Sequence, residues 1–510
     1  MNLGPLVDAV QDATREALAL VPRIWERDHT VWDEDPTELA DRLGWLWAPE
    51  RASAALPGWR DRVDEVVADG FTDVLLVGMG GSSLYPQVLA ATQPVATGHP
   101  RLHVLDSTDP AAVLATEEAL PWASTLLVAA SKSGTTIETT CHLERFMARL
   151  REVHGPAAGR HVLAVTDPGT ALDERASREG FRAVLHGEAD VGGRFSALTA
   201  FGLVPAALLG VDVEAHLAPA RRQLAAARST DPDVNAPAVL GATLAAAVRA
   251  GRDKLTLLLP DRLAALGDWI EQLLAESTGK RGTGIVPVVG GSPEPGELGD
   301  DRIVLAWGED AGLDVVVADG VPLVRLPAVT DADIAGEVVR LEFATAVAGA
   351  LLGVNPFDQP DVAAAKQATA AALERGDPLP AEEDPATVLA SAQRGDYVAL
   401  LGFVTPGGAD EQTLHRAAAA LRRRLGLPVT VGIGPRYLHS TGQLHKGGPG
   451  TGIFLLAVGA DPVDVEVPGK GLTFSGLKRA QAVGDLTALR EAGRRVSHVS
   501  VDALSALAES

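Results

Sequence analysis

The chain has 510 residues, more than one ordinary hydrophobic core supports, so two or three domains are expected. Hydrophobic residues make up 46% of the chain and charged residues 22%, a balance typical of a globular protein in water. The formal net charge of −23 argues against nucleic acid as a partner, because phosphate backbones are bound by basic faces, yet a few local donors can still bind a small phosphorylated ligand.

A helical segment is predicted over residues 1–50. Its first 18 residues have the spacing of an amphipathic helix and lack the basic and then apolar layout of a signal peptide. No apolar run along the chain reaches ~18 residues, so no membrane-spanning helix is expected. The single cysteine, Cys141, excludes an intramolecular disulfide and a zinc site built from cysteines. These features favour a cytoplasmic protein without a membrane partner.

A first α/β series is predicted over residues 51–215. Short apolar runs with the character of buried strands alternate there with helix-length patterns. The runs are DVLLV (73–77), RLHVL (101–105), TLLVAA (125–130) and HVLAV (161–165). This alternation predicts a parallel sheet with helices on both faces.

A second series is predicted over residues 216–373. Strands are expected at 254–260, 285–289, 304–307 and 313–318, and helices at 263–277 and about 331–353. A loop rich in proline, glycine and acidic residues covers 290–301.

A third series follows a predicted linker at 374–385, whose proline and acidic content suits an exposed hinge. Over 386–510, strands are expected at 396–404, 428–433 and 452–458, with a helix at about 410–425. The pattern leaves open whether this segment is a separate domain or completes the second sheet.

Two strand-to-helix loops have the composition of a phosphate cradle. In VGMGGSSLYP (77–86), glycines such as Gly81 let the backbone turn tightly, and Ser82 places a hydroxyl beside a helix N-terminus, which favours anions. The dinucleotide pattern GxGxxG lacks its third glycine here, so no nicotinamide cofactor is expected.

The second loop, SKSGTT, follows the strand at 125–130. Ser131, Ser133 and Thr136 supply hydroxyl donors, and Lys132 adds a nearby positive charge. Helix capping alone would also explain any one of these hydroxyls. Because ligands of open parallel sheets bind at the carboxyl ends of the strands, two such loops in one sheet favour a phosphate site.

Three later segments contain groups that could perform chemistry. Arg194 follows Gly193 just before a predicted helix, and Glu276 ends a strong helical pattern before a glycine loop. Asn355 and Pro356 form a turn, and the helix after it ends at Lys366. Taken singly, these segments also fit a surface arginine, a helix C-terminus and an ordinary turn.

Together the segments resemble the phosphoglucose isomerase family, which interconverts glucose 6-phosphate and fructose 6-phosphate in glycolysis and gluconeogenesis. Five motifs occur in the family's order over residues 70–370. They are GGS at 80–82, SKSGTTIET at 131–139, GGRFS at 192–196, ESTGK at 276–280 and FDQPDVAAAK at 357–366.

The resemblance implies an α/β fold with two sugar-isomerase (SIS) domains, each a mainly parallel sheet between helices, here followed by a C-terminal α/β extension. It also implies a homodimer that needs no metal and no organic cofactor.

The resemblance also assigns roles in the site. Glu276 would be the base that moves a proton between C1 and C2, Arg194 would steady the negative oxygen, and Lys366 would shuttle protons with a histidine. Gly193 and Gln359 would line the cavity. The phosphate would be bound by Gly81, Ser82, Ser131, Lys132, Ser133 and Thr136.

The chain departs from the family in several places. Asp361 stands where Gly or Ala is usual, and Ala363 where Glu is usual. Residues 307–309 keep the family's WGE, but its ring-opening histidine does not follow them, and the chain continues for 144 residues beyond Lys366.

The missing histidine has a candidate in this extension. STGQLHKGG (440–448) resembles the family's histidine motif with one additional residue before the histidine, and similar segments occur in the isomerase half of fused transaldolase–isomerase proteins. We therefore expect His445, or as a second choice His439, to open the sugar ring.

Other functions remain possible from the sequence. A dual phosphoglucose and phosphomannose isomerase differs only in pocket shape. A non-catalytic sugar-phosphate sensor would usually lack the base and the lysine, both of which are present. An amino-sugar synthase needs an N-terminal catalytic cysteine, which Cys141 cannot provide.

Overall fold

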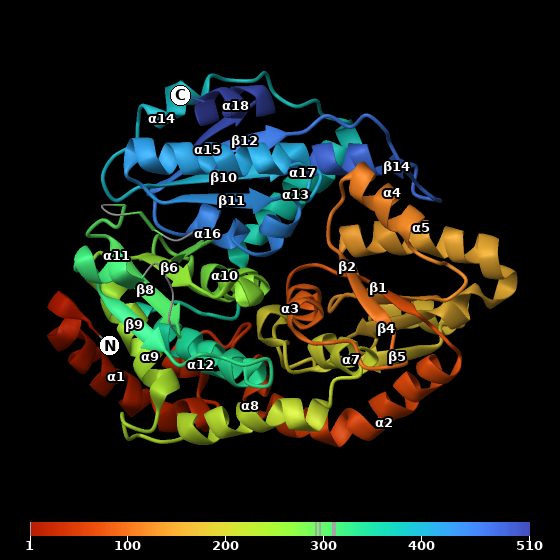
Figure 1. Cartoon of the computed structure of the whole chain (residues 1–510), viewed down its shortest axis with the longest axis horizontal. Coiled ribbons are helices and arrows are strands. Elements are labelled where there is room, and N and C mark those ends of the chain that lie inside the picture. Colours follow the sequence, from red (N-terminus) through yellow and green to blue (C-terminus); the bar gives the residue numbers. More distant parts are fainter. Residues whose placement is uncertain (1, 291–292, 295–296, 309–312, 510) are drawn as a thin grey trace.

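Three separate parallel sheets, each covered by helices, organise the chain (Figure 1). The structure is a computed structural model that describes residues 2–290, 293–294, 297–308 and 313–509. None of the helices in these ranges is both long and apolar enough to cross a membrane. The predicted α/β class is confirmed.

The first unit contains a five-stranded sheet in the order β2-β1-β3-β4-β5, with every neighbouring pair parallel. Its central strands are buried along their whole length, as expected for a sheet covered on both faces. The strands are β1 (Asp73–Val77), β2 (Arg101–Leu105), β3 (Thr125–Ala130), β4 (Val162–Thr166) and β5 (Ala183–His186). The helices are α3 (Leu84–Thr92), α4 (Pro110–Ala119), α5 (Ile137–His154), α6 (Ala171–Glu179) and α7 (Ala200–Leu208).

The second unit contains four described strands in the order β7-β6-β8-β9, again parallel. Its helix α12 is apolar and buried on nearly every face, so it forms the centre of the largest core. The strands are β6 (Lys254–Leu258), β7 (Val286–Val289), β8 (Arg302–Trp307) and β9 (Leu323–Leu326). The helices are α8 (Val213–Ala227), α9 (Ala236–Arg249), α10 (Ala264–Thr278), α11 (Leu313–Ala318) and α12 (Ile334–Leu352).

One predicted strand of this unit is wrong. Residues 313–318 form the helix α11, although their three valines favour a strand. Leu313 and Val316 are buried against the apolar side chains of β6 and β8, whereas Asp314 and Val317 are exposed. This burial at a spacing of three residues suits a helix, and tertiary packing outweighs the local preference of valine.

The C-terminal segment forms its own sheet rather than completing the second one. The four parallel strands have the order β11-β10-β12-β15, and a short antiparallel pair, β13-β14, lies outside this sheet. The strands are β10 (Tyr397–Phe403), β11 (Val429–Ile433), β12 (Gly452–Val458), β13 (Glu466–Val467), β14 (Leu472–Thr473) and β15 (Arg495–Val499). The helices are α14 (Pro385–Leu389), α15 (Ala409–Leu425), α16 (Gly442–Gly447), α17 (Phe474–Glu491) and α18 (Val501–Glu509).

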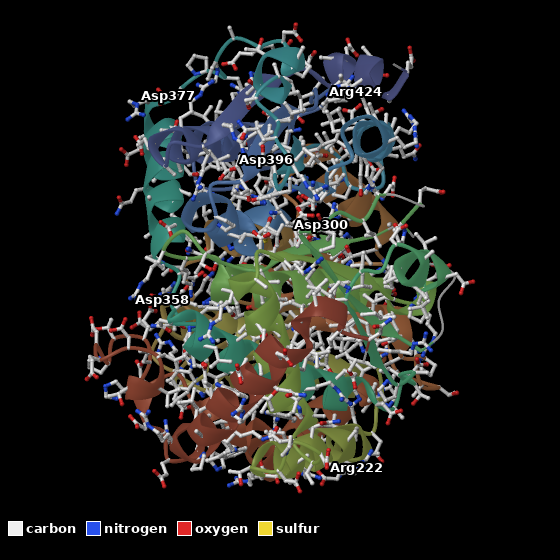
Figure 2. All side chains as sticks on the ribbon, turned by 90° about the vertical axis from the view of Figure 1, so that its left-hand side faces the viewer. Arg222, Asp300, Asp358, Asp377, Asp396 and Arg424 are labelled. Atoms are coloured by element: carbon white, nitrogen blue, oxygen red, sulfur yellow. The ribbon has the colours of Figure 1, made fainter. Side chains whose placement is uncertain are left out.

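Helix α13 (Pro360–Arg375) connects the second and third units. Figure 2 shows it between its flanking residues Asp358 and Asp377, rising along the C-terminal unit. It packs closely on α17, where a Cβ at Gly484 would lie 2.4 Å from Thr369 Oγ1. The helix of the family's lysine motif therefore belongs, by packing, to the C-terminal unit.

Two N-terminal helices, α1 (Val7–Trp25) and α2 (Ala48–Ala68), run beneath the first and second units (Figure 1). The indole of Trp25 donates to the carbonyl of Ala227 at 3.0 Å, and that of Trp32 donates to Ala346 at 2.8 Å. These indole hydrogen bonds anchor the segment to α8 and α12.

The third unit docks on the first through buried ion pairs. The ammonium of Lys478 in α17 lies 2.9 Å from a carboxylate oxygen of Asp109 and also contacts Asp461. Thr405 donates to the other oxygen of Asp109 at 2.9 Å. Arg436 donates to both oxygens of Asp106, at 2.8 and 3.0 Å. The loop after β2 thus presents its carboxylates to the C-terminal unit.

We expect Lys478→Met to destabilise the protein, because it leaves Asp109 buried without a counter-ion. Removing one partner of a buried pair typically costs about 3–5 kcal/mol. Denaturant unfolding should show an earlier transition. Arg394→Met is the control, since its pair with Asp300, labelled in Figure 2, also joins the third unit to another unit but is 81% and 80% exposed. Equal shifts in both variants would contradict the buried anchor.

Candidate active site

The two predicted phosphate loops lie on adjacent strands. β1 and β3 pair in parallel, and their carboxyl ends lead into the short helical turn Gly80–Ser82 and into residues 131–136. Ser131 donates to Thr136 Oγ1 at 3.0 Å. Thr136 is the N-cap of α5, yet its side chain makes no capping bond within the described residues. Backbone N–H groups at the start of α5 can therefore receive an anion.

The side chain of Lys132 does not add a free charge to this loop. Its ammonium lies 2.5 Å from a carboxylate oxygen of Asp167 and donates to the carbonyl of Glu188 at 2.9 Å. Because Asp167 already compensates this positive charge, the geometry of the side chain does not support the expected role of Lys132 in phosphate binding. The hydroxyls and backbone of the loop remain as donors.

The first phosphate loop touches the loop that carries Arg194. A Cβ at Gly81 would lie 1.9 Å from the carbonyl oxygen of Gly193, which no side chain tolerates. Glycine is therefore required for this close approach. The turn Gly80–Ser82, whose residues are buried, thus packs on the segment 193–195.

Arg194 and Glu276 form a buried pair between the first and second units. Their side chains are 4% and 7% exposed, and Arg194 Nη1 lies 3.3 Å from Glu276 Oε1. The guanidinium also donates to Ser277 Oγ at 3.1 Å and to the carbonyl of Asp358 at 2.5 Å. With the carbonyl of Pro356 at 3.3 Å, three fixed acceptors hold the arginine beside the carboxylate, which α10 places at its last turn.

Lys280 is a second cation behind this pair. Its ammonium lies 2.7 Å from Asp358 Oδ1 and donates to the carbonyl of Asn355. Burial, followed by the charge of Arg194, lowers the pKa of Lys280 from 10.5 to about 7. These contacts fix the turn at 355–358 against the end of α10.

His439 is the histidine that lies next to the phosphate loop. Its Nε2 is 2.9 Å from Glu138 Oε1, in the first turn of α5. Gln272 in α10 donates to the carbonyl of His439 at 2.8 Å and to Glu276 Oε2 at 3.2 Å. One amide therefore contacts both the candidate base and the backbone that carries the imidazole.

A polar chain supports Glu138 from behind. Gln481 in α17 donates to Glu138 Oε1 at 2.7 Å and accepts from Thr108 Oγ1 at 2.7 Å. Burial is the largest influence on this carboxyl and favours its neutral form. The opposing influences, led by the charge of His439, outweigh burial and hold the pKa of Glu138 below its ordinary value. The carboxylate can thus orient the imidazole.

A cavity of about 240 Å³ brings candidate residues of the first and third units together, although Arg194 and Glu276 are not among its lining residues. One wall is formed by the phosphate loop and the start of α5, and the others by α13, α17 and the segment 438–446. The polar residues that line it are Ser133, Thr135, Thr136, Glu138, Lys366, Thr369, His439, Lys446, Gln481 and Asp485. Its hydroxyls, imidazole and ammonium groups suit a phosphorylated polyol.

His445, the first choice from the sequence, lies elsewhere. It does not line this cavity. The centroid of its ring lies 5.0 Å from the ring centroid of Phe454 and 6.1 Å from that of Tyr437. Burial, followed by the charge of Lys446, lowers its pKa well below the ordinary value. A neutral ring in an aromatic cluster fits packing, so the geometry favours the second choice, His439.

The lysine motif is only partly brought to the site. Lys366, an exposed residue of α13, lines the cavity. Gln359 is also exposed and is not among the lining residues. The departure at Asp361 has a structural explanation: its N–H donates to Gln443 Oε1 at 3.0 Å, and its carboxylate accepts from Gln443 Nε2 at 2.5 Å. This reciprocal pair attaches α13 to α16.

Several residues of the site were missed from the sequence. Glu138 stands inside the SKSGTTIET motif, where its place at the start of a helix was a usable signal. Gln481 and Asp485 come from α17, which no motif marked. Trp307 is structural, since its indole donates to Glu337 at 3.0 Å, and Glu309 lies outside the described residues.

Within the described ranges, no group of three or more His, Cys, Asp or Glu side chains could hold a metal ion.

A second cavity of about 720 Å³ lies between α10, α15 and β11. Glu271 faces it and accepts from Ser440 Oγ at 3.4 Å. Burial, followed by the charge of Asp268, raises the pKa of Glu271 from 4.5 to about 8. The carboxyl is thus largely protonated near neutral pH.

Comparison with known proteins gives a consistent picture. Residues 59–289 match the family model described as phosphoglucose isomerase. A glucose-6-phosphate isomerase of Rubrobacter xylanophilus is 30% identical over 398 residues, which cover 66% of this chain and 91% of the relative. A glucose-6-phosphate isomerase of Acaryochloris marina is 37% identical over 227 residues, 43% of this chain and 42% of that relative.

Solved structures agree on the fold. A hypothetical protein from Thermus thermophilus has a TM-score of 0.58 and 27% identity, covering 71% of this chain and 94% of its own. A glucose-6-phosphate isomerase from Chlamydia trachomatis has a TM-score of 0.59 at 19% identity, covering 73% of this chain and 86% of its own.

We expect Glu271→Gln to flatten the pH dependence of stability. Between pH 4.5 and about 8 the folded chain keeps a proton that the unfolded chain releases, so stability falls as pH rises through this window. Thermal unfolding at pH 5 to 8 should show that the melting temperature of the variant, relative to that of the parent, increases with pH and is highest at pH 8. Glu491→Gln, at an exposed position of α17, should follow the parent. Parallel curves for all three proteins would refute the buried acid.

Proposed function

Because this chain belongs to the phosphoglucose isomerase family, we propose that it interconverts glucose 6-phosphate and fructose 6-phosphate through an enediolate, as an aldose–ketose isomerase. The observation that carries the proposal is the buried Arg194–Glu276 pair beside two hydroxyl-rich loops. A base, a cation and an anion cradle are the groups that this reaction needs.

Glu276 is the proposed base. The hydrogen on the carbon next to a carbonyl is a weak acid, so its removal needs a carboxylate held close to it. The carboxylate takes the proton from one carbon and returns it to the other. The guanidinium of Arg194 stabilises the negative oxygen of the enediolate. Gln272 keeps the carboxylate in place by donating to its second oxygen.

The phosphate anchors the substrate away from the reacting carbons. Its proposed ligands are Gly81, Ser82, Ser131, Ser133 and Thr136, and the loops that carry them follow the carboxyl ends of the paired strands β1 and β3. Binding there orients the sugar chain rather than stabilising the reaction directly.

His439 is the proposed ring-opening group, with Glu138 as its positioning partner. Imidazole can donate and accept protons near neutral pH, and the carboxylate at 2.9 Å fixes its orientation. Lys366, on the wall of the same cavity, is proposed to assist with hydroxyl protons. The homodimer and the cytoplasmic location expected from the sequence remain predictions.

We expect Glu276→Gln to lower turnover of fructose 6-phosphate by a factor on the order of 10² or more, because an amide cannot accept the proton. Binding of the sugar phosphate should persist. A coupled assay of glucose 6-phosphate formation measures the turnover. Glu342→Gln is the matched control, since burial already raises the pKa of Glu342 well above its ordinary value. Undiminished turnover in Glu276→Gln would eliminate it as the base.

We expect His439→Gln to lose far more activity on fructose 6-phosphate than on erythrose 4-phosphate, a four-carbon aldose phosphate that cannot close a ring. The difference arises because only the cyclic substrate needs the imidazole before proton transfer. His445→Gln should affect both substrates alike. The ratio of kcat/KM values for the two substrates is the measurement, and an equal loss on both in His439→Gln would remove its ring-opening role.

A further inference from the structure

An ion pair that the mechanism above does not use lines the 240 Å³ cavity that also contains His439 and Lys366. Lys446 comes from α16 and Asp485 from α17, and both are among the residues that surround the 240 Å³ cavity. Lys446 Nζ lies 2.5 Å from Asp485 Oδ1, and the two side chains are 4% and 0% exposed. Both groups belong to the C-terminal extension, outside the five motifs of the sequence.

Neighbouring groups fix this pair rigidly. Tyr437 donates its hydroxyl to Asp485 Oδ2 at 2.8 Å, and the ammonium of Lys446 donates to the carbonyl of Gly442 at 3.2 Å. Burying an ion pair brings little net stability, because desolvation offsets the attraction. Its place on a cavity wall that also presents hydroxyl groups and an imidazole suits recognition of a ligand better than it suits stabilisation of the fold.

The chemistry of the pair favours hydroxyl groups over phosphate. An ammonium has three N–H donors, and its charge is here compensated by the carboxylate beside it. A phosphate dianion would be repelled by Asp485. A sugar hydroxyl can accept from Lys446, and the next hydroxyl can donate to Asp485. The phosphate donors, Ser133 and Thr136, come from the other side of the cavity, on the first unit.

We propose that Lys446 and Asp485 form a subsite that binds neighbouring hydroxyl groups of the sugar chain, separate from the phosphate cradle. The inference rests on the proposed function, since it takes the cavity as the place of the sugar phosphate. It makes the C-terminal unit responsible for recognising the configuration of the sugar.

The test is the double variant Lys446→Met with Asp485→Asn, which removes both charges and leaves neither partner buried alone. We expect the KM for fructose 6-phosphate to rise at least about tenfold, the effect of losing hydrogen bonds to charged groups. The inhibition constant of inorganic phosphate should stay the same, because phosphate alone does not reach the pair.

A matched control is the double variant Asp253→Asn with Lys254→Met. These residues form another Lys–Asp pair, 2.7 Å apart, with a lysine that is 2% exposed and outside the cavity. It should leave the KM unchanged. An equal rise in KM for both double variants would reduce the role of Lys446 and Asp485 to stability, and a parallel weakening of phosphate inhibition would place them in the phosphate site. Either outcome overturns the proposal.

Failure of the isomerase function can be told apart from failure of the subsite. Absence of turnover in the unmodified protein would refute the function, and calorimetric binding would then test the subsite. The double variant should bind 6-phosphogluconate, an open-chain sugar-acid phosphate, about tenfold more weakly and bind inorganic phosphate as before. Unchanged affinity for 6-phosphogluconate would overturn the subsite directly.

Discussion

The hydrogen bond between His439 and Glu138 joins side chains that are 301 residues apart in the chain. It can form only when the third sheet is docked on the first, since the imidazole belongs to one unit and the carboxylate to the other. The docking depends on carboxylates of the loop after β2, which Lys478 and Arg436 neutralise. The geometry of the candidate site is therefore a property of how the units pack, and no single unit contains it.

Gln272 extends this dependence to the base. Its amide donates to both the carbonyl of His439 and the carboxylate of Glu276. The position of the third unit therefore restrains the base on α10. Gln443 in α16 pairs with Asp361 of α13 and also donates to the carbonyl of Gly279, just after α10, at 3.0 Å. Groups from all three units are thus joined by hydrogen bonds, and these bonds hold the units in one arrangement.

The sequence predicts most of the fold because buried parallel strands are continuous apolar runs bounded by loops. It fails where local preference and burial disagree, as in α11, and where strands carry polar side chains, as in β15 with Arg495 and His498. The local motifs locate Arg194 and Glu276. They offer His439 only as a second choice after His445, because the partner of His439 lies in a distant segment and no spacing connects the two. The pairing of Lys132 with Asp167, in the loop after the next strand, is likewise invisible in the local sequence.

In open parallel sheets, the crevice where strand order reverses is the usual place for a ligand. In the third sheet that place is between β10 and β12, on whose following loops Thr405 and Asp461 stand. Here Asp109 of the first unit enters between them, with Lys478 as its counter-ion. A carboxylate of the first unit takes the position of a bound anion. The crevice that usually binds a ligand therefore forms part of the interface between the third unit and the first. The third unit lines the 240 Å³ cavity through other elements, namely α16, α17 and His439.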